Sequence, residues 1–377
     1  MTRRPYTVVL IIPTGIGAAI GGYAGDALPV ARAIAQVADT LITHPNVLNG
    51  AQLYWPMDNA LYVEGYALDK FAAGWYALQP VHQNRVGLIL DRAIEPDLQL
   101  RHLQAADAAR ATLGINLADY IVTDAPLEVQ LRTSNSGSSW GTIGNPESLL
   151  RAAELSVEKA KAEAIAVVAR FPDDEDTLVL ERYRHGQGVD PIGGAEAVIS
   201  HLIVRTFEIP CAHAPALAPL ALDSNLSPRS AAEELGYTFL PCVLAGLSRA
   251  PQLVSQDSRP RSLSPNTIWA EQVDAVVVPA TACGGSAILS FSQTKTQIIA
   301  VRDNKTQMQV PPERLGINAL QVNSYLEALG LLVAHRAGIS YSALTRYLVN
   351  SSYRGYVWAQ GRVTDTCSMS DQQAQGL

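Results

Sequence analysis

The amino-acid sequence predicts an α/β protein whose mostly parallel sheets are flanked by helices. Three observations carry this prediction. Short apolar runs rich in valine and isoleucine recur along the chain, segments of helical period separate them, and loops containing glycine or proline follow several of the runs. Strands that alternate with helices in this way are typical of parallel sheets. Two similar Rossmann-like halves that face a cleft are one arrangement that the pattern allows.

The length of 377 residues exceeds the size at which a single hydrophobic core usually stops growing. We therefore predict two regions. Residues 1–145 form an N-terminal α/β half with a glycine loop, and residues 146–377 form a second α/β half with C-terminal helices. Hydrophobic residues make up 48% of the chain and charged residues 17%, which is ordinary for a compact protein and excludes a disordered one.

The net charge and the cysteine content limit the classes of binding partner and the cellular compartment that we expect. The net charge is −7 and no long run of Lys or Arg occurs, so we expect no nucleic-acid partner. The four cysteines have no CxxC spacing and are too few for a disulfide scaffold, which fits a reducing, cytoplasmic location. No apolar run reaches about 18 residues, so we expect no membrane partner. A homo-oligomer stays open.

The N-terminus has one feature that resembles an export signal, because Arg3 and Arg4 precede an apolar run. Pro13 and the following glycines interrupt that run early. Removal of the segment would also delete a predicted strand and loop. We therefore expect it to be part of the fold rather than a signal peptide.

The stretch over residues 7–50 predicts a strand, a glycine loop, a helix and a second strand. Residues 8–12 form a β-branched run, helical spacing resumes over residues 28–37, and a second apolar run covers residues 40–43. Glycines let backbone N–H groups approach a ligand closely, so the loop between the first strand and the helix is a candidate site for an anion. Its predicted substrate-binding residues are Thr14, Gly15, Gly17, Gly21 and Gly22.

A glycine loop between a strand and a helix is also where dinucleotide-binding folds place pyrophosphate, so NAD(P) is one candidate cofactor. The match is incomplete. Gly15, Gly17 and Gly21 give GxGxxxG in place of GxGxxG. In addition, the second strand ends in His44-Pro45-Asn46, where a ribose-binding Asp or Glu is expected. The cofactor therefore stays unknown, and a glycine turn needed only for packing stays open.

Further elements follow in the same alternation. The sequence predicts strands within residues 85–94, ending at Asp91, and over residues 119–125 and 165–171. It predicts helices over residues 96–113, 146–164 and 195–205, the last one preceded by two glycines. Residues 133–145 are dense in serine and glycine and predict a flexible loop that closes on a ligand. Residues 51–76 are rich in aromatic side chains and form either a lid over the glycine loop or a corner of the core.

The second half repeats the first weakly. A strand over residues 273–279 precedes a loop with two glycines, and a strand over residues 297–301 precedes a polar group that ends in Asn304. If this repeat is real, two similar loops face one another across a cleft, the usual place for a small-molecule site. Residues 319–338 and 340–350 have helical period, and residues 368–377 are predicted to be a frayed tail.

Three side chains form the predicted catalytic set. His44 follows a strand and has an ordinary pKa near 6.5, which suits a general acid or base. Cys283 lies beside glycines whose N–H groups could stabilise a thiolate nucleophile. Asp26 could pair with His44 or with a ligand hydroxyl. Cys211 and His213 suggest a metal pair, but no further ligand has supporting spacing, so we predict no metal. The remaining predicted substrate-binding residues are Asn46, Asn49, Gly284, Gly285 and Asn304.

The segment PTGIGAAIGGYAGDA followed by LITHPNVLNGA resembles the signature of a bacterial protein family of unknown function. The resemblance is clearest in the N-terminal region and extends to VVVPATACGG and IIAVRDN. It implies a functional surface at the glycine loop and implies no activity or catalytic residue. A looser architectural likeness is to amino-acid racemases with two facing α/β halves. This chain departs from them because its N-terminal loop has no cysteine to match Cys283, so a two-thiol mechanism is not expected.

The sequence thus predicts an enzyme of small-molecule metabolism that binds an anionic carboxylate or phosphate and needs no metal. The reaction would be of the isomerase, lyase or hydrolase type and would use acid–base or thiol chemistry. Two alternatives stay open. One is an NAD(P)-dependent oxidoreductase, and the other is a non-catalytic metabolite sensor.

Overall fold

A computed structural model describes residues 4–173, 177–235, 239–256, 264–344, 355–359 and 362–366. The chain forms two compact units, Met1–Leu329 and Gly330–Leu377. Within the second unit, the described residues include the end of helix α12 (Tyr325–Ala337) and the antiparallel strands β15 (Gly355–Ala359) and β16 (Arg362–Thr366). The predicted frayed tail lies outside the described residues. The rest of this section concerns the first unit.

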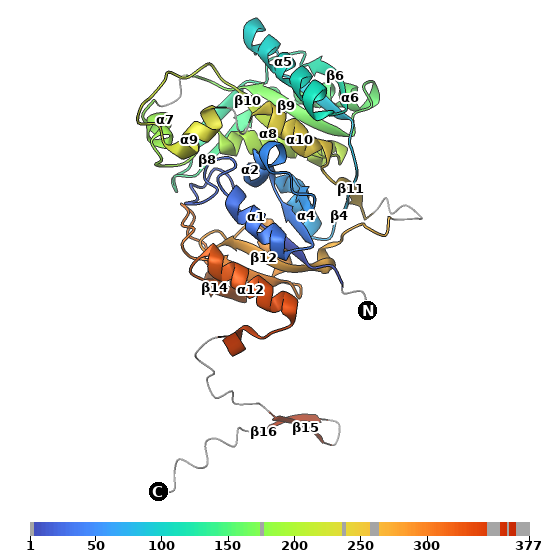
Figure 1. Ribbon diagram of the computed structural model, residues 1–377, viewed down its shortest axis with the longest axis vertical. Coiled ribbons are helices and arrows are strands. Elements are labelled where there is room, and N and C mark those ends of the chain that lie inside the picture. Colours follow the sequence, from blue (N-terminus) through green and yellow to red (C-terminus); the bar gives the residue numbers. More distant parts are fainter. Residues whose placement is uncertain are drawn as a thin grey trace. The chain divides into compact units, whose positions relative to one another are not determined.

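The first unit contains a six-stranded sheet with the order β14-β13-β12-β1-β2-β3, and all of its pairings are parallel. From the central pair the chain moves outward in both directions, through β2 and β3 on one side and through β13 and β14 on the other. In Figure 1 the N-terminal part of the chain, in blue, lies beside the orange part that contains β12 and β14. The strand order therefore reverses between β1 and β12. The strands are β1 (Thr7–Leu10), β2 (Thr40–Thr43), β3 (Ala60–Tyr62), β12 (Val273–Pro279), β13 (Gln297–Val301) and β14 (Ala319–Val322).

A second, four-stranded sheet has the order β10-β9-β5-β6 and is also parallel throughout. Its strand order reverses between β9 and β5. The predicted α/β class with mostly parallel sheets is thereby confirmed. The strands are β5 (Val86–Leu90), β6 (Leu117–Val122), β9 (Ala164–Arg170) and β10 (Cys211–Ala216).

The segments that form the two sheets alternate along the chain. The six-stranded sheet uses residues 7–62 and 273–322, whereas the four-stranded sheet uses residues 86–122 and 164–216. The predicted boundary at residue 145, between an N-terminal and a second α/β half, stays a prediction. The two segments that resemble each other in sequence meet in one sheet, where Val9 of β1 lies opposite Val276 of β12. Their loops therefore leave the same edge of the sheet from neighbouring strands.

Two segments differ from the sequence-based expectation. Residues 133–145, predicted to be a loop, belong largely to an antiparallel hairpin of β7 (Val129–Thr133) and β8 (Ser139–Ile143), and only the tip over residues 134–138 is a turn. The predicted helix over residues 319–338 begins instead with strand β14, because Ala319–Val322 pairs with β13 before helix α12 starts. A second small antiparallel pair joins β4 (Tyr76–Gln79) to β11 (Gln252–Ser255).

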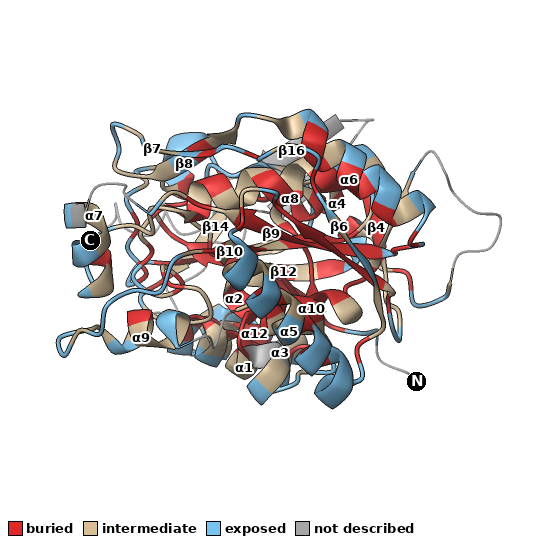
Figure 2. Ribbon diagram, turned by 90° about the horizontal axis from the view of Figure 1, so that it is seen from above, coloured by how far each residue is buried: buried red, intermediate tan, exposed pale blue. Residues whose placement is uncertain are grey.

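Helices cover the faces of both sheets, and the main core continues from one sheet to the other. Phe71 of α4 and Phe291 of α11 are fully buried and meet edge to face, with ring centroids 6.3 Å apart. Burial of such a side chain is worth about 1.5–3 kcal/mol. Buried positions follow the strands and the inner faces of the helices in Figure 2. The longer or core-facing helices are α1 (Leu28–Val37), α4 (Gly65–Ala72), α5 (Pro96–Leu113), α6 (Pro146–Glu158), α8 (Gly193–Phe207), α10 (Leu240–Ser248) and α11 (Ser286–Phe291).

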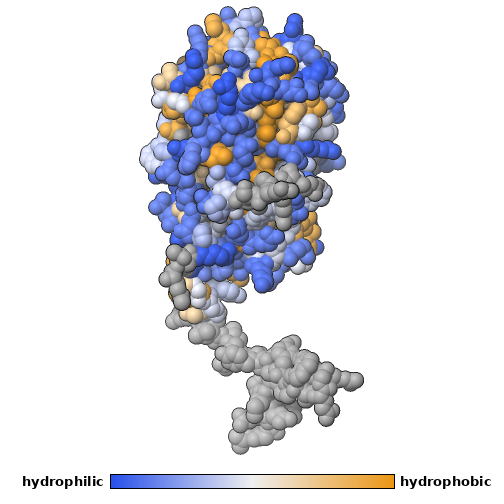
Figure 3. Space-filling model, turned by 90° about the vertical axis from the view of Figure 1, so that its right-hand side faces the viewer, coloured by the Kyte–Doolittle hydropathy of each residue, from blue (hydrophilic) through white to orange (hydrophobic). Residues whose placement is uncertain are grey.

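The aromatic segment over residues 51–76 divides between core and surface. Tyr62 and Phe71 are buried, whereas Tyr54, Trp55 and Trp75 are more than half exposed. On the face drawn in Figure 3, hydrophobic side chains gather in the upper part among hydrophilic ones. No helix within the described ranges is long and apolar enough to cross a membrane.

Candidate functional site

The glycine loop over residues 11–27 leaves the carboxyl end of β1, at the place where the strand order reverses. Gly15 has φ +69° and Gly21 has φ +88°, both in the left-handed region that favours glycine. At Gly21 a Cβ atom would lie 2.6 Å from Cγ2 of Ile12, closer than real atoms approach. Both predicted glycines are therefore required by the backbone and by its packing.

Three distant segments pack against this loop. The Ser139 N–H donates to the carbonyl of Gly15 at 2.8 Å, and Gly194 at the start of α8 donates its N–H to Ser139 Oγ at 3.2 Å. The N–H of Gln307 donates to the carbonyl of Ile16 at 2.8 Å. Residues 137–139, 188–194 and 304–307 thus converge on the loop.

The loop keeps unused donors. Within the part of the chain that the structure describes, the backbone N–H groups of Gly15 and Gly17 donate to no protein acceptor. The two N–H groups are separated by Ile16, and Gly15 is buried whereas Gly17 is partly exposed. Backbone N–H groups at the carboxyl end of parallel strands, where the strand order reverses, are a common anion site in open α/β sheets.

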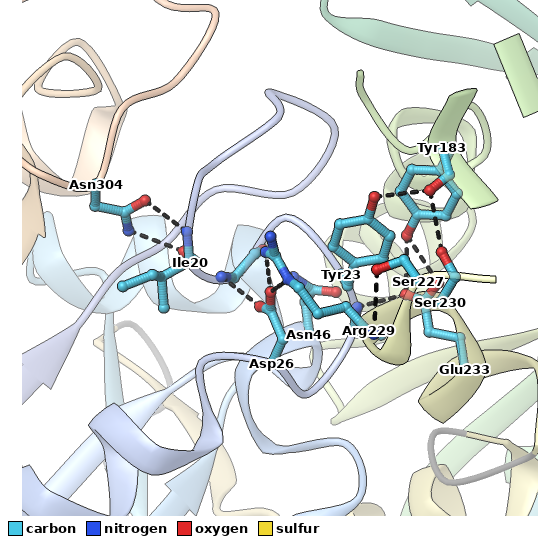
Figure 4. A network of polar contacts seen from close by, with 12 residues as sticks. Ile20, Tyr23, Asp26, Asn46, Tyr183, Ser227, Arg229, Ser230, Glu233 and Asn304 are labelled. Carbon is cyan, nitrogen blue, oxygen red and sulfur yellow. Dashed lines mark hydrogen bonds and ion pairs between the residues drawn. The ribbon is translucent and has the colours of Figure 1, made fainter. Parts of the chain in front are cut away.

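Several predicted substrate-binding residues instead hold the loop backbone (Figure 4). Asn304 is fully buried, accepts the N–H of Ile20 at 2.9 Å and donates to the carbonyl of Ile20 at 2.8 Å. The Asn46 amide donates to the carbonyl of Gly21 at 2.9 Å, and Asn49 accepts the hydroxyl of Tyr62 at 3.0 Å. Asn304 and Asn46 therefore hold the backbone of the glycine loop, whereas Asn49 binds Tyr62 of strand β3.

Asp26 pairs with Arg229 and not with His44, which was one of its two predicted partners beside a ligand hydroxyl. Its carboxylate accepts the N–H of Gly21 and hydrogen bonds from the guanidinium of Arg229, which in turn lies 4.4 Å over the ring of Tyr23. Burial raises the pKa of Asp26, and the neighbouring Arg229 opposes that rise. The pair fixes the far end of the glycine loop against helix α9 (Pro228–Glu234), as Figure 4 shows.

His44 is buried at the carboxyl end of β2, where its Nε2 accepts the N–H of Ile12 at 3.1 Å. Burial lowers the pKa of His44 to about 4, so the ring is neutral near pH 7. A general acid or base works best when its pKa lies near the working pH, and a pKa of about 4 lies well below it. The structure gives His44 the role of a backbone acceptor that ends β1, and the predicted catalytic role gains no support from it.

Cys283 is fully buried behind the loop that follows β12, and burial raises its pKa to about 11. A thiolate nucleophile needs the opposite environment, one that lowers the pKa. Gly284 and Gly285 lie beside it on the surface, and a Cβ atom at Gly285 would meet nothing within 4 Å. Within the described part of the chain, no hydrogen bond joins Cys283, Gly284 or Gly285 to the glycine loop. Thr14 is the remaining predicted loop residue with a partly exposed side chain.

Two carboxyl groups that the sequence did not single out lie beside the loop. Oε1 of Glu233 accepts the N–H of Ala24 at 2.5 Å and Oε2 accepts the hydroxyl of Tyr183 at 2.8 Å. Burial, helped by the nearby Asp190, raises the pKa of Glu233 to about 8. Asp190 approaches the loop near Gly193, and burial together with Glu196 raises its pKa to about 7. The sequence signal was weak: Asp190 stands shortly before Gly193 and Gly194, and Glu233 belongs to no recognised catalytic motif.

A chain of polar side chains continues from this region along α8. His213 Nε2 lies 3.7 Å from Glu196 and its Nδ1 lies 3.2 Å from Ser200 Oγ. The Ser200 hydroxyl lies 3.4 Å from Glu64, whose carboxylate also meets His201 at 2.9 Å. Among the residues with a described placement, no three His, Cys, Asp or Glu side chains are arranged to hold a metal ion.

A separate hollow of about 390 Å³ lies on the outer side of α1, away from the glycine loop. Arg32 is its one ionisable lining residue and stacks on Trp55 at 4.3 Å. The acid and base groups described above do not line it. The glycine loop therefore remains the better candidate for chemistry.

Comparison with known proteins bears on the family. Residues 7–345 match the family described as "Protein of unknown function (DUF3326)". The chain belongs to this family. The DUF3326 chain is also 60% identical, over 346 residues, to an uncharacterized lipoprotein of Synechococcus, with 92% of this chain and 95% of the relative covered. No solved structure matches. The family resemblance that the glycine-loop motifs indicated is confirmed.

Proposed function

We propose that this DUF3326 protein is an enzyme of small-molecule metabolism that binds an anionic substrate at the glycine loop and uses acid–base chemistry. One observation carries the proposal. Unused N–H donors of Gly15 and Gly17 lie at the carboxyl end of β1, where the strand order reverses beside β12. Such a switch point is where open parallel sheets bind their ligands.

The neighbouring carboxyl groups supply the chemistry. A general acid or base works best when its pKa lies near the working pH, and Asp190 and Glu233 have pKa values raised to about 7 and about 8. In this proposal they carry the proton, while Gly15 and Gly17 donate hydrogen bonds to the anionic group. His44 and Cys283 act as structural residues.

The NAD(P)-dependent alternative receives less support from the geometry. In dinucleotide-binding folds the glycine loop opens directly into the helix, whose N-terminus faces the pyrophosphate. Here helix α1 begins only at Leu28, several residues after Gly21, and β2 is followed by His44 rather than by an acidic residue. A non-catalytic sensor stays open, since it would use the same donors without the carboxyl groups.

A ligand screen tests the proposal. We expect small carboxylates or phosphates, and not NAD(P)H, to raise the thermal midpoint of the purified protein, because a ligand that binds only the folded state stabilises it. Turnover of the ligand found should be lost in Glu233→Gln and kept in Cys283→Ala. A shift with NAD(P)H alone would overturn the proposal, and full turnover by Glu233→Gln would remove the acid–base role.

We also propose a cytoplasmic location. Val8, Val9 and Leu10 are fully buried in β1, which pairs with β12 on one side and β2 on the other. A secretory signal is removed from the mature chain, and cleavage after this run would remove a central strand. The relative from Synechococcus bears the name lipoprotein, so the location needs a direct test.

Cell fractionation with mass spectrometry provides that test. We expect the protein in the soluble fraction and expect peptides covering residues 5–32 in its digest. Recovery with membranes, together with the loss of those peptides, would contradict the proposed location.

A further inference from the structure

Three serine hydroxyls meet at the tip of the β7–β8 hairpin. Ser134 Oγ lies 2.7 Å from Ser136 Oγ and 2.7 Å from Ser138 Oγ, and the last two oxygens are 3.0 Å apart. The turn that brings them together closes with the Gly137 N–H donating to the carbonyl of Ser134 at 2.9 Å, and Gly137 has φ +87°. The three side chains therefore converge on one point and are partly or fully exposed there.

The hairpin tip is anchored to the proposed site. Ser139, the next residue, binds both the carbonyl of Gly15 and the N–H of Gly194. Gln307 lies between the hairpin tip and the glycine loop. A Cβ atom added to Gly137 would lie 3.8 Å from Oε1 of Gln307, and one added to Gly17 would lie 3.3 Å from its Cγ. The serine tip and the unused N–H groups of the glycine loop are thus held by the same contacts.

We infer that the substrate carries a phosphate group, which the hydroxyls of Ser134, Ser136 and Ser138 bind beside the glycine loop. This inference rests on the proposed function, because it assigns the anionic group of the same substrate. Each hydroxyl has one proton to donate, and in the free protein the three hydroxyls share these protons among themselves. A tetrahedral phosphate offers three oxygens on one side and accepts one proton from each serine, whereas a carboxylate has two oxygens in a plane.

Charge on the same hairpin favours an anion. Arg132 lies two residues before Ser134, stacks over Trp140 at 5.3 Å and donates to Gln130 at 3.2 Å. None of the ion pairs among the described residues includes Arg132, so its positive charge is not neutralised by one. Hydrogen bonds from neutral donors to a charged acceptor are about twice as strong as those between neutral groups, which compensates for the loss of the serine–serine bonds.

Isothermal titration calorimetry on the full chain tests the inference with inorganic phosphate, glycerol 3-phosphate and acetate as probes. We expect at least one of the two phosphates to bind and acetate not to bind at the same concentration. The triple variant Ser134→Ala, Ser136→Ala, Ser138→Ala should weaken phosphate binding by about tenfold for each bond lost. Binding of glycerol 3-phosphate alone would assign a phosphate ester, and equal binding of both would assign the phosphate group itself.

A control variant keeps the result interpretable. Ser292→Ala removes a serine hydroxyl that donates to the carbonyl of Leu289 at 2.7 Å, outside the hairpin and the glycine loop, and should leave phosphate affinity unchanged. Unchanged phosphate affinity in a folded triple variant, or no binding of either phosphate to the parent, would overturn the inference. A carboxylate substrate whose turnover survives the triple variant would overturn it and leave the proposed function standing.

Discussion

Gly194→Ala should lower the free energy of unfolding by about 3 kcal/mol, at the upper end of the usual cost of overpacking. A Cβ atom at this position would lie 2.2 Å from the carbonyl oxygen of Ser139 and 2.5 Å from Cα of Trp140. Both are backbone atoms, so no side-chain rotation can relieve the clash. The β7–β8 hairpin must separate from the start of α8, and urea unfolding at constant pH should report the loss.

Gly285→Ala is the matched control for this prediction. Gly285 also stands at the start of a helix, but it has φ −70° and a Cβ atom there would meet nothing within 4 Å. The backbone conformation suits alanine, so we expect a change within about 0.5 kcal/mol, or a slight stabilisation through the unfolded state. Equal losses in the two variants would show that the contact between the hairpin and α8 does not carry the effect.

Gly194→Ala should also affect ligand binding at the glycine loop. The same contact holds the serine tip beside Gly15, so Gly194→Ala should also weaken binding of the anionic ligand, whereas Gly285→Ala should not. A loss of stability without a loss of binding would separate the hairpin from the proposed site.

Elements with strong local patterns could be predicted from the sequence. The helix over residues 28–37 and the strands over residues 40–43, 273–279 and 297–301 have the predicted bounds. Each is a short apolar or amphipathic run ended by glycine, proline or a polar residue, so local chemistry decides it. The hairpin over residues 129–143 was missed because its turn and strand β8 are rich in serine, threonine and glycine, so its pairing rather than its composition determines it.

The site depends on partners that local patterns do not reveal. Asp26 finds Arg229 across 203 positions of sequence, and Glu233 meets Ala24 across 209. His44 has the residue type and position of a catalytic group, but burial and a backbone partner reverse the chemistry that the sequence suggests. Burial is a property of the whole fold, so residue type alone could not distinguish such a structural histidine from a reactive one.

Between about pH 6.5 and 8, the free energy of unfolding should depend less on pH in Glu233→Gln than in the parent protein. We expect this reduction to be larger than for substitution of any other carboxyl group by its amide. The pKa of Glu233 is raised to about 8 in the folded protein, far above the ordinary value of 4.5. In this window the folded protein holds a proton that the unfolded chain has released. The contribution of Glu233 to the free energy of unfolding is therefore complete at low pH and is lost as pH rises through the pKa of the folded state. The loss is about 1.4 kcal/mol per pH unit for one proton.

His44 and Asp190 determine the pH range in which the effect of Glu233 can be observed. His44, with its pKa lowered to about 4, gives stability that rises with pH only below its ordinary value of 6.5, so it contributes little above that point. Asp190 acts in the same direction as Glu233 but loses its proton earlier, near pH 7. Urea unfolding at several pH values across the window should show a slope that is smaller in Glu233→Gln by about one proton.

Glu234→Gln is the matched control, because this neighbouring carboxylate pairs with Arg184 at 2.7 Å on the outer side of the same helix. It should shift stability by a similar amount at every pH across the window and leave the slope unchanged. Gln at position 233 can still accept the N–H of Ala24, so the glycine loop should keep its conformation. An unchanged slope in Glu233→Gln would mean that this carboxyl is already ionised near pH 7, which would exclude it as the proton donor at the glycine loop.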